Sequence, residues 1–213
     1  ITKTVEYHGK KFGYVFLRTF MASSDDMKSG VSEMIGFLKK HKLQGIVIDL
    51  RGNFGGYIDI LQQILALFFD KPKKIMNVQR QDRKESFETA HGMPTISGVA
   101  DLPMVVLVDN RSYSSSEIFA GIIKESNRGI VVGITTGGLV EIARFFQLRQ
   151  QGQEVGLCIT TGKVSLPGGS VLEGQGVRPD FYVPLTKADV LAGKDSQLEA
   201  ALYVLEREVR NKK

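Results

Sequence analysis

The sequence predicts a single α/β domain, in which one sheet is flanked by helices and carries a small antiparallel hairpin. Apolar strand-like runs alternate with amphipathic helical segments along the 213 residues, a pattern typical of a sheet covered by helices. Hydrophobic residues make up 42% of the chain and charged residues 24%, the balance of an ordinary globular protein. A chain of this length suits one domain of roughly 100–200 residues, so we expect residues 1–213 to form one unit.

The first half predicts two strand–helix units. Residues 14–20 favour a strand, and a helix capped by Asp25 follows, with apolar residues at helical spacing. Residues 45–50 (GIVIDL) form a nearly continuous apolar run, which is typical of a strand buried on both faces. After the turn RGNFGG (residues 51–56), a second helix is predicted over residues 58–69.

The alternation is interrupted and then returns. Residues 73–101 are predicted to be irregular or weakly stranded because glycine and proline punctuate them. Residues 103–110 (PMVVLVDN) predict a third apolar strand, the turn RSY follows, and residues 114–126 predict a helix. Residues 129–134 predict a fourth strand.

The last part of the chain predicts a hairpin and a final helix. Residues 144–148 and 155–161 are expected to pair antiparallel, and the helix begins at Asp195 or Ser196. One apolar stripe marks this helix: Leu198, Ala201, Leu202, Leu205 and Val209. In an open α/β sheet, ligands bind at the carboxyl ends of the strands, where the turns 51–56 and 111–113 are expected.

Composition excludes several kinds of site. The formal net charge of +5 is spread among acidic residues, which favours a solvated face over a nucleic-acid-binding patch. Cys158 is the only cysteine, so the chain cannot form an internal disulfide or a multi-cysteine metal site. The longest apolar run, residues 60–69, is shorter than the ~20 residues of a membrane-spanning helix. We expect no cofactor, no metal and no stable membrane insertion.

Ser114 is the leading candidate nucleophile. It follows an apolar strand and opens a helix, where free N–H groups and the helix dipole favour developing negative charge. The N–H of Ser115 is one candidate donor to an oxyanion, and Gly55 or Gly56 is the other, since glycine lets backbone approach a substrate closely. An alternative stays open, because Ser114 and Glu117 also have the spacing of a helix capping box.

Three segments in order resemble the tail-specific, C-terminal processing serine peptidases. They are residues 45–69 (GIVIDLRGNFGG and its helix), residues 103–138 (PMVVLVDNRSYSSSEIF onward) and residues 173–202 (EGQGVRPD onward). The resemblance implies a ClpP/crotonase-like sheet and a nucleophile at Ser114. It also implies that the chain is cut from a longer protein with a PDZ domain before it, which agrees with a first residue, Ile1, that is not an initiator Met.

The general base is the part of the family pattern from which this sequence departs. In the Ser–Lys branch of the family a lysine is expected where this chain has Leu139, and leucine cannot accept a proton. The chain is more similar to the tricorn-like and retinoid-binding-protein-like branch, in which serine works with a histidine and a glutamate, here Glu173. We expect His8 and His41 to be structural, so the base is either His91 or a histidine from outside these residues.

The resemblance implies an extracytoplasmic serine endopeptidase, in the bacterial periplasm or cell envelope, that cleaves unfolded or C-terminal polypeptide segments through an acyl-enzyme. A homo-oligomer is left open. Two alternatives are kept: a catalytically impaired module of the same fold that binds peptides or hydrophobic ligands, and a crotonase-like acyl-CoA enzyme, which fold analogy alone suggests.

Overall fold

Ten strands and five helices are described in the computed structural model, which covers residues 1–21, 24–91, 96, 98–150 and 153–211. The strands are β1 (Thr2–Tyr7), β2 (Lys10–Phe16), β3 (Ile46–Asp49), β4 (Lys74–Gln79), β5 (Lys84–Glu88), β6 (Met104–Val108), β7 (Ile130–Gly133), β8 (Ile142–Gln150), β9 (Gln153–Ser165) and β10 (Phe181–Tyr182). The helices are α1 (Ser24–Lys40), α2 (Ile58–Ala66), α3 (Ser115–Glu125), α4 (Lys187–Leu191) and α5 (Ser196–Asn211). Over the described residues, none of these helices is both long and apolar enough to cross a bilayer.

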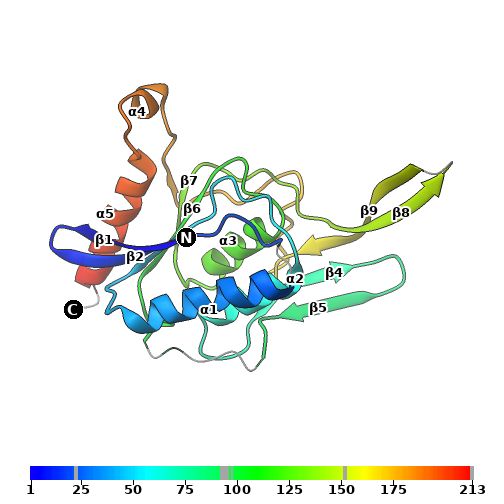
Figure 1. Ribbon diagram of the computed structural model, residues 1–213, viewed down its shortest axis with the longest axis horizontal. Coiled ribbons are helices and arrows are strands. Elements are labelled where there is room, and N and C mark those ends of the chain that lie inside the picture. The colour runs from blue at the N-terminus through cyan, green and yellow to red at the C-terminus, as the bar shows by residue number, and fades with distance from the viewer. Residues whose placement is uncertain (22–23, 92–95, 97, 151–152, 212–213) are drawn as a thin grey trace.

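A six-stranded sheet forms the body of the molecule, in the order β1-β2-β3-β6-β7-β10 (Figure 1). β2, β3, β6, β7 and β10 run parallel, and β1 adds an antiparallel edge. Every residue of β3 and β6 is buried, because helices cover both faces of the sheet. The predicted α/β class is confirmed.

The side chains of β3 alternate between two cores. Ile46 and Ile48 point into the larger core, which contains apolar residues of α1, α2 and α3. Val47 points the other way, into a smaller core shared with α5. This period of two explains why GIVIDL lacks polar alternation, since each successive side chain meets a helix on one face or the other.

A second sheet of four antiparallel strands, in the order β5-β4-β9-β8, extends from the body (Figure 1). The predicted hairpin is confirmed as β8–β9, and it is longer than expected. Residues 73–101 were predicted to be irregular or weakly stranded, and part of this segment is more regular than that, because β4 and β5 form a paired hairpin. The less exposed positions of β5 (KESFE) are Glu85 and Phe87, so the strand contains too few apolar residues for an alternation to be visible in the sequence. Residues 92–95 and 97 lie outside the described residues.

Other boundaries shifted by a few residues. The strand predicted over residues 14–20 is β2 and ends at Phe16, while Phe20 forms a separate parallel bridge with Gly56. The helix predicted over residues 58–69 ends at Ala66. The short elements β10 and α4 were not predicted, because two and five residues carry too little periodicity to be detected.

A charged cluster holds α5 against the β1–β2 hairpin. The carboxylate of Glu206 accepts hydrogen bonds from Lys10 (2.9 Å) and Arg210 (2.7 Å) and lies 3.0 Å from His8 Nδ1. Hydrogen bonding from Lys10, followed by His8, lowers the pKa of Glu206 to about 2 from its usual 4.5. The depressed pKa means that the carboxylate stabilises the fold above about pH 4.5, and that this stabilisation is lost as the pH falls toward 2.

We therefore expect Glu206→Gln to lower the melting temperature at neutral pH, and the difference from the wild type to shrink between pH 4.5 and about 2. Thermal unfolding followed by circular dichroism across this range measures the effect. Glu199→Gln, in the first turn of the same helix, is the matched control. If the difference in melting temperature between Glu206→Gln and the wild type stayed constant over this pH range, the stabilising role assigned to the Glu206 carboxylate would be contradicted.

Candidate active site

Two turns meet at the carboxyl ends of β3 and β6. The strands are parallel neighbours in register, with Asp49 opposite Leu107, so the turns that follow them open at the same edge of the sheet. Backbone and side-chain bonds join the turns: Tyr113 N–H donates to Asn53 O (2.9 Å), and Gly52 N–H donates to the Asp109 carboxylate (2.9 Å). The structure thus brings the RGNFGG turn beside the turn that leads to Ser114.

Ser114 lies at a sharp strand-to-helix turn. Its φ of 55° and ψ of −118° are sparsely populated for a residue with a side chain, a strain that costs about 1–3 kcal/mol. The Glu117 carboxylate accepts from Ser114 N–H (3.1 Å), and the predicted capping box of Ser114 and Glu117 is present. The Glu117 N–H donates to the Ser114 backbone carbonyl (2.8 Å), which satisfies that donor without the hydroxyl. A strained, half-buried serine fits a nucleophile better than a simple cap.

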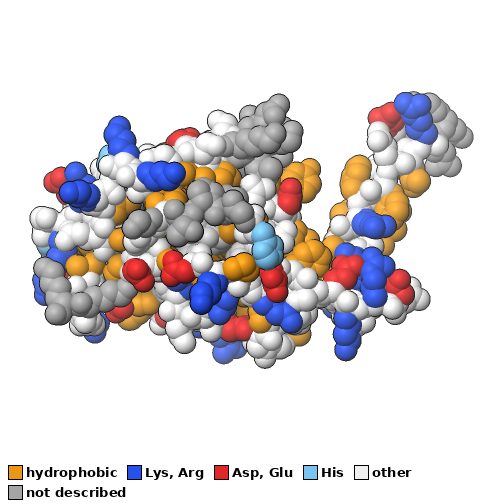
Figure 2. Space-filling model, turned by 90° about the horizontal axis from the view of Figure 1, so that it is seen from below, with side chains coloured by type: hydrophobic (Ala, Val, Ile, Leu, Met, Phe, Trp, Pro, Cys, Tyr) orange, Lys and Arg blue, Asp and Glu red, His pale blue; other side chains and the backbone are white. Residues whose placement is uncertain are grey.

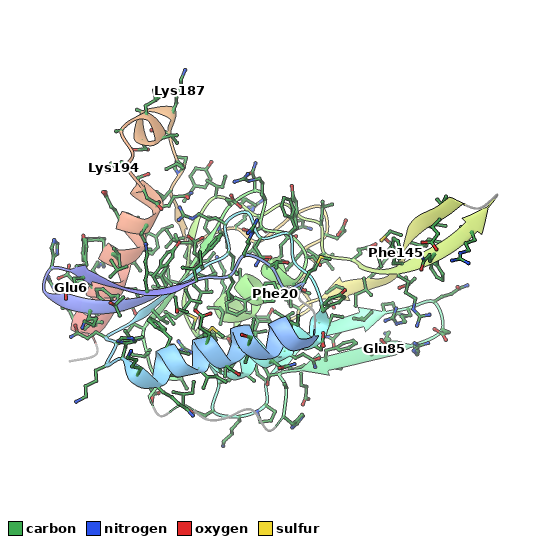
Figure 3. The ribbon with its side chains drawn as sticks, viewed as in Figure 1. Glu6, Phe20, Glu85, Phe145, Lys187 and Lys194 are labelled. Atoms are coloured by element: carbon green, nitrogen blue, oxygen red, sulfur yellow. The ribbon has the colours of Figure 1, made fainter. Side chains whose placement is uncertain are left out.

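The glycine turn lies directly against Ser114. A Cβ on Gly55, whose φ is +88°, would stand 2.7 Å from Ser114 Cβ and 3.0 Å from Ser115 N. Gly56 packs on the far side against Phe20, which Figure 3 labels near the centre of the molecule, and a Cβ there would stand 2.1 Å from the carbonyl carbon of Phe20. Only glycine allows both approaches.

Two backbone donors face this region. Asn53 Oδ1 accepts the N–H of Gly55 (2.9 Å). Within the described part of the chain, the N–H groups of Gly56 and Ser115 donate to no protein acceptor. The Ser115 hydroxyl donates to Gly56 O (2.8 Å) and so ties the two residues together. The predicted oxyanion residues are therefore neighbours, with Gly56 and Ser115 as the free donors and Gly55 providing the close approach.

Gly55→Ala is expected to reduce turnover on the order of 10²-fold or more, because the added Cβ displaces Ser114 from the oxyanion donors. Steady-state hydrolysis with the full-length protein measures this, with the melting temperature recorded alongside. Gly52→Ala is the matched control: its φ is also positive (+69°), but its Cβ would meet nothing closer than Arg111 at 3.7 Å. Unchanged turnover in Gly55→Ala would contradict the geometry.

Glu117 organises the loop that closes the site. Its carboxylate is fully buried and accepts four hydrogen bonds. The donors are Ser114 N–H (3.1 Å), Thr136 Oγ1–H (2.6 Å), Gly138 N–H (2.7 Å) and Leu139 N–H (2.9 Å). Leu139 O in turn accepts from Ser114 N–H (2.9 Å). These hydrogen bonds hold residues 136–139 beside Ser114.

Glu117→Gln is expected to lower the free energy of unfolding by about 3 kcal/mol or more, because an amide nitrogen would face backbone N–H donors and leave them unpaired. Urea denaturation measures the change. Glu199→Gln, on exposed α5 surface, should change stability by about 0.5 kcal/mol or less. Equal effects of the two substitutions would show that the buried carboxylate does not organise the loop.

Glu173 lies beside the same loop. Its carboxylate accepts from Val140 N–H (2.7 Å) and Glu141 N–H (3.2 Å), and the N–H of the next residue donates to Gly138 O (2.8 Å). The side chain is half-buried. One loop, residues 136–141, therefore contacts both Ser114 and Glu173.

The structure does not bring a general base to Ser114. Leu139 stands where the Ser–Lys branch would carry its lysine, and it is 57% exposed. His8 lies 3.0 Å from Glu206, and the ring of His41 lies tilted against that of Phe37, with centroids 5.0 Å apart. His91 is largely exposed, with its Nε2 3.8 Å from Glu88. None of these described side chains hydrogen-bonds to the serine.

A partly buried ion-pair network holds Arg51, the first residue of the RGNFGG turn. Arg51 pairs with Asp49 (2.6 Å), makes two hydrogen bonds to Asp195 (2.8 and 2.8 Å) and donates to Gln197 (3.0 Å). Although burial alone would raise the pKa of Asp195, hydrogen bonding from Arg51 holds it below its usual value. Burial, aided by the Asp49 charge, raises the pKa of Tyr14, whose hydroxyl donates to Asp49 (2.7 Å). The contact between Arg51 and Asp195, which are 144 residues apart, was not predicted from the sequence.

Exposed apolar side chains surround the site. Phe54 stacks on Tyr113 with ring centroids 5.7 Å apart, directly beside the nucleophile turn. Other large apolar residues in the same segments are also exposed: Met21, Tyr57 and Leu139. No cluster of three or more His, Cys, Asp or Glu suited to a metal ion occurs among the residues described. The arrangement is suited to hydrolysis by a serine that is surrounded by exposed apolar side chains.

Comparisons with known proteins agree on one family. The model of peptidase family S41 matches residues 11–183. A carboxyl-terminal-processing protease of Picosynechococcus sp. is 32% identical over 206 residues, which are 95% of this chain and 47% of the relative. A probable CtpA-like serine protease of Staphylococcus aureus is 31% identical over 189 residues, covering 87% of this chain and 36% of the relative.

Solved structures give the same result. The photosystem II D1 C-terminal processing protease is 26% identical, with a TM-score of 0.67 over 82% of this chain and 42% of that protein. The chain therefore spans about half the length of the relatives it matches.

Proposed function

Because the chain belongs to peptidase family S41, we propose that it is the catalytic core of a serine endopeptidase that cleaves unfolded or C-terminal polypeptide segments. The observation that carries the proposal is the strained Ser114 turn, packed against Gly55 beside the free N–H groups of Gly56 and Ser115. Residues 1–213 would act as one domain, with Ser114 as the nucleophile. The substrate is a polypeptide.

The proposed reaction proceeds through an acyl-enzyme. Ser114 Oγ attacks the scissile carbonyl carbon and gives its proton to a base, while the carbonyl oxygen becomes an oxyanion that accepts from the N–H groups of Gly56 and Ser115. The base then protonates the leaving amine, and the C–N bond breaks. Water, activated by the same base, hydrolyses the ester and restores the serine.

We assign the base to a histidine from outside these 213 residues. The support is that Leu139 cannot take a proton and that His8, His41 and His91 contact other groups. Glu173 would orient that histidine, as the third member of a triad does. Val140 and Glu141 hold the carboxylate in place through their N–H groups, so its position does not depend on the base.

A location outside the cytoplasm, in the bacterial periplasm or cell envelope, is part of the proposal and is supported by the family resemblance alone. Cell fractionation with an antibody against this domain tests it. A homo-oligomer is also part of the proposal, and light scattering of the purified full-length protein tests it.

A catalytically impaired binding module is the second candidate. The observation that favours it is the exposed Leu139 beside a serine that has no base in contact. Titration of the full-length protein with unfolded polypeptide and with hydrophobic ligands, run beside a hydrolysis assay, separates the two. Binding without turnover supports the module, and turnover that depends on Ser114 supports the peptidase.

A further inference from the structure

The β8–β9 hairpin projects from the body of the molecule as an arm. Figure 1 shows it extending away from the six-stranded sheet, and Figure 2 shows apolar side chains along it. Phe145, labelled in Figure 3, lies on this arm and is 71% exposed. A two-stranded ribbon is marginally stable in water, so apolar side chains on it need a reason beyond its own folding.

The register of the hairpin separates its side chains onto two faces. Residues directly opposite each other share a face, and three such pairs fall together: Arg144 with Ile159, Phe146 with Leu157, and Leu148 with Val155. This apolar face contains five large apolar side chains, each between 41% and 50% exposed: Phe146, Leu148, Val155, Leu157 and Ile159.

The opposite face is mostly polar and satisfied by its own contacts. Glu154 bonds to Arg149 (3.0 Å) and to Gln147 (2.9 Å) across the strands. The ring of Phe145 covers Gly156, where an added Cβ would meet the ring at 2.2 Å. The two faces therefore differ in chemistry: the first contains five large, half-exposed apolar side chains, whereas the second contains Phe145 among mostly polar and small residues.

The apolar face begins at the candidate active site. The loop that contacts Ser114 through Leu139 O and Glu173 through the N–H of Glu141 continues without a break into β8 at Ile142. Strands rise about 3.3 Å per residue, so the nine residues of β8 reach ~30 Å from the nucleophile loop. A polypeptide lying along β8 would thus have one end at the serine.

One edge of β8 is open. In the described part of the sheet β8 pairs only with β9, so its outer N–H and C=O groups can pair with an added strand. An extended chain bound there would place alternate side chains on the apolar face.

We propose that the apolar face and open edge of β8 form a docking surface for an extended, apolar segment of the polypeptide substrate. The proposal rests on the proposed peptidase function for the identity of the occupant. Five half-exposed side chains present roughly 300–500 Å², less than the ~800 Å² that each partner of a stable complex buries. A surface of this size suits a transient substrate better than a permanent partner.

The test measures binding separately from turnover. Fluorescein-labelled β-casein, an unfolded polypeptide, is titrated by anisotropy against the full-length Ser114→Ala protein. The apolar-face variant is Phe146→Thr with Leu157→Thr, and the matched control on the other face of the same two strands is Gln147→Thr with Cys158→Thr. Threonine keeps the strand propensity in both.

We expect the apolar-face variant to weaken β-casein binding about tenfold or more, since each large apolar side chain loses much of its burial. The control should change it less than about twofold at a similar melting temperature. When Ser114 is intact, the apolar-face variant should have a higher KM for β-casein than the wild type, while its hydrolysis of a short ester is unchanged. Anisotropy measures binding without turnover, so the two proposals are tested separately. Absence of hydrolysis would count against the proposed peptidase function, whereas the β-casein affinities would still decide whether β8 is a docking surface.

Two outcomes would overturn the proposal. One is equal β-casein affinity in the apolar-face variant and the control. The other is a concentration-dependent dimer in light scattering that the apolar-face variant abolishes, which would make a second copy of this chain the occupant.

Discussion

Ser114→Ala is expected to lower the hydrolysis of an unfolded polypeptide by the full-length protein about 10⁶-fold, the loss typical when a serine nucleophile is removed. The reason is that the neighbouring hydroxyl in this turn, that of Ser115, already donates to Gly56 O (2.8 Å). The fold should persist, because Ser114 bonds to Leu139 and Glu117 through its backbone N–H and carbonyl groups, which alanine retains. Release of casein peptides measures the change.

Ser126→Ala is the control for this substitution. Ser126 follows the last turn of α3, and its hydroxyl donates only to Ile122 O. Turnover should stay within a few-fold of the wild type. Residual turnover of Ser114→Ala near the wild-type rate would mean that the nucleophile lies elsewhere.

Residues 1–213 alone are expected to fold and to turn over polypeptide about 10⁴-fold more slowly than the full-length protein, the loss that follows when the rest of a triad cannot act. Ser114 lies beside the free N–H groups of Gly56 and Ser115, and Val140 N–H donates to the Glu173 carboxylate, but none of the described histidines hydrogen-bonds to the hydroxyl. Side-by-side kinetics of the two proteins measure the ratio.

His91→Ala separates the two sources of a base that the sequence leaves open. In the full-length protein we expect it to change turnover less than about twofold, because His91 is exposed and faces Glu88. Robust cleavage by residues 1–213, abolished by His91→Ala, would instead assign the base to that histidine.

The sequence was sufficient for the central sheet and for the meeting of the two candidate turns at its edge. β3 and β6 are recognisable because each is a continuous apolar run, and a run of that kind needs helices on both faces. Turns after neighbouring parallel strands must meet at one edge, so the approach of Gly55 to Ser114 follows from topology.

The contacts that hold the site could not be predicted in the same way. Glu117 has the spacing of a local cap, yet its carboxylate also binds Thr136, Gly138 and Leu139 about twenty residues on. Arg51 reaches Asp195 across 144 residues. A pattern reports periodicity and local spacing, whereas these partners are set by how distant segments pack.

The structure also changes what a glycine substitution would report. From the sequence, Gly56→Val is expected to remove an oxyanion donor and leave the fold intact. A Cβ at Gly56 would stand 2.1 Å from the backbone of Phe20, so such a variant would disrupt the turn itself. Gly55, which faces Ser114, is the informative position.

Labelling with a fluorophosphonate probe tests the central claim most directly, because the reagent phosphonylates only a serine that is activated and supplied with oxyanion donors. The folded full-length protein should gain one adduct, and peptide mass spectrometry should place it on Ser114, with none in Ser114→Ala. An intact, folded protein that gains no adduct, or that gains it on another residue, would contradict the assignment of Ser114 as the nucleophile.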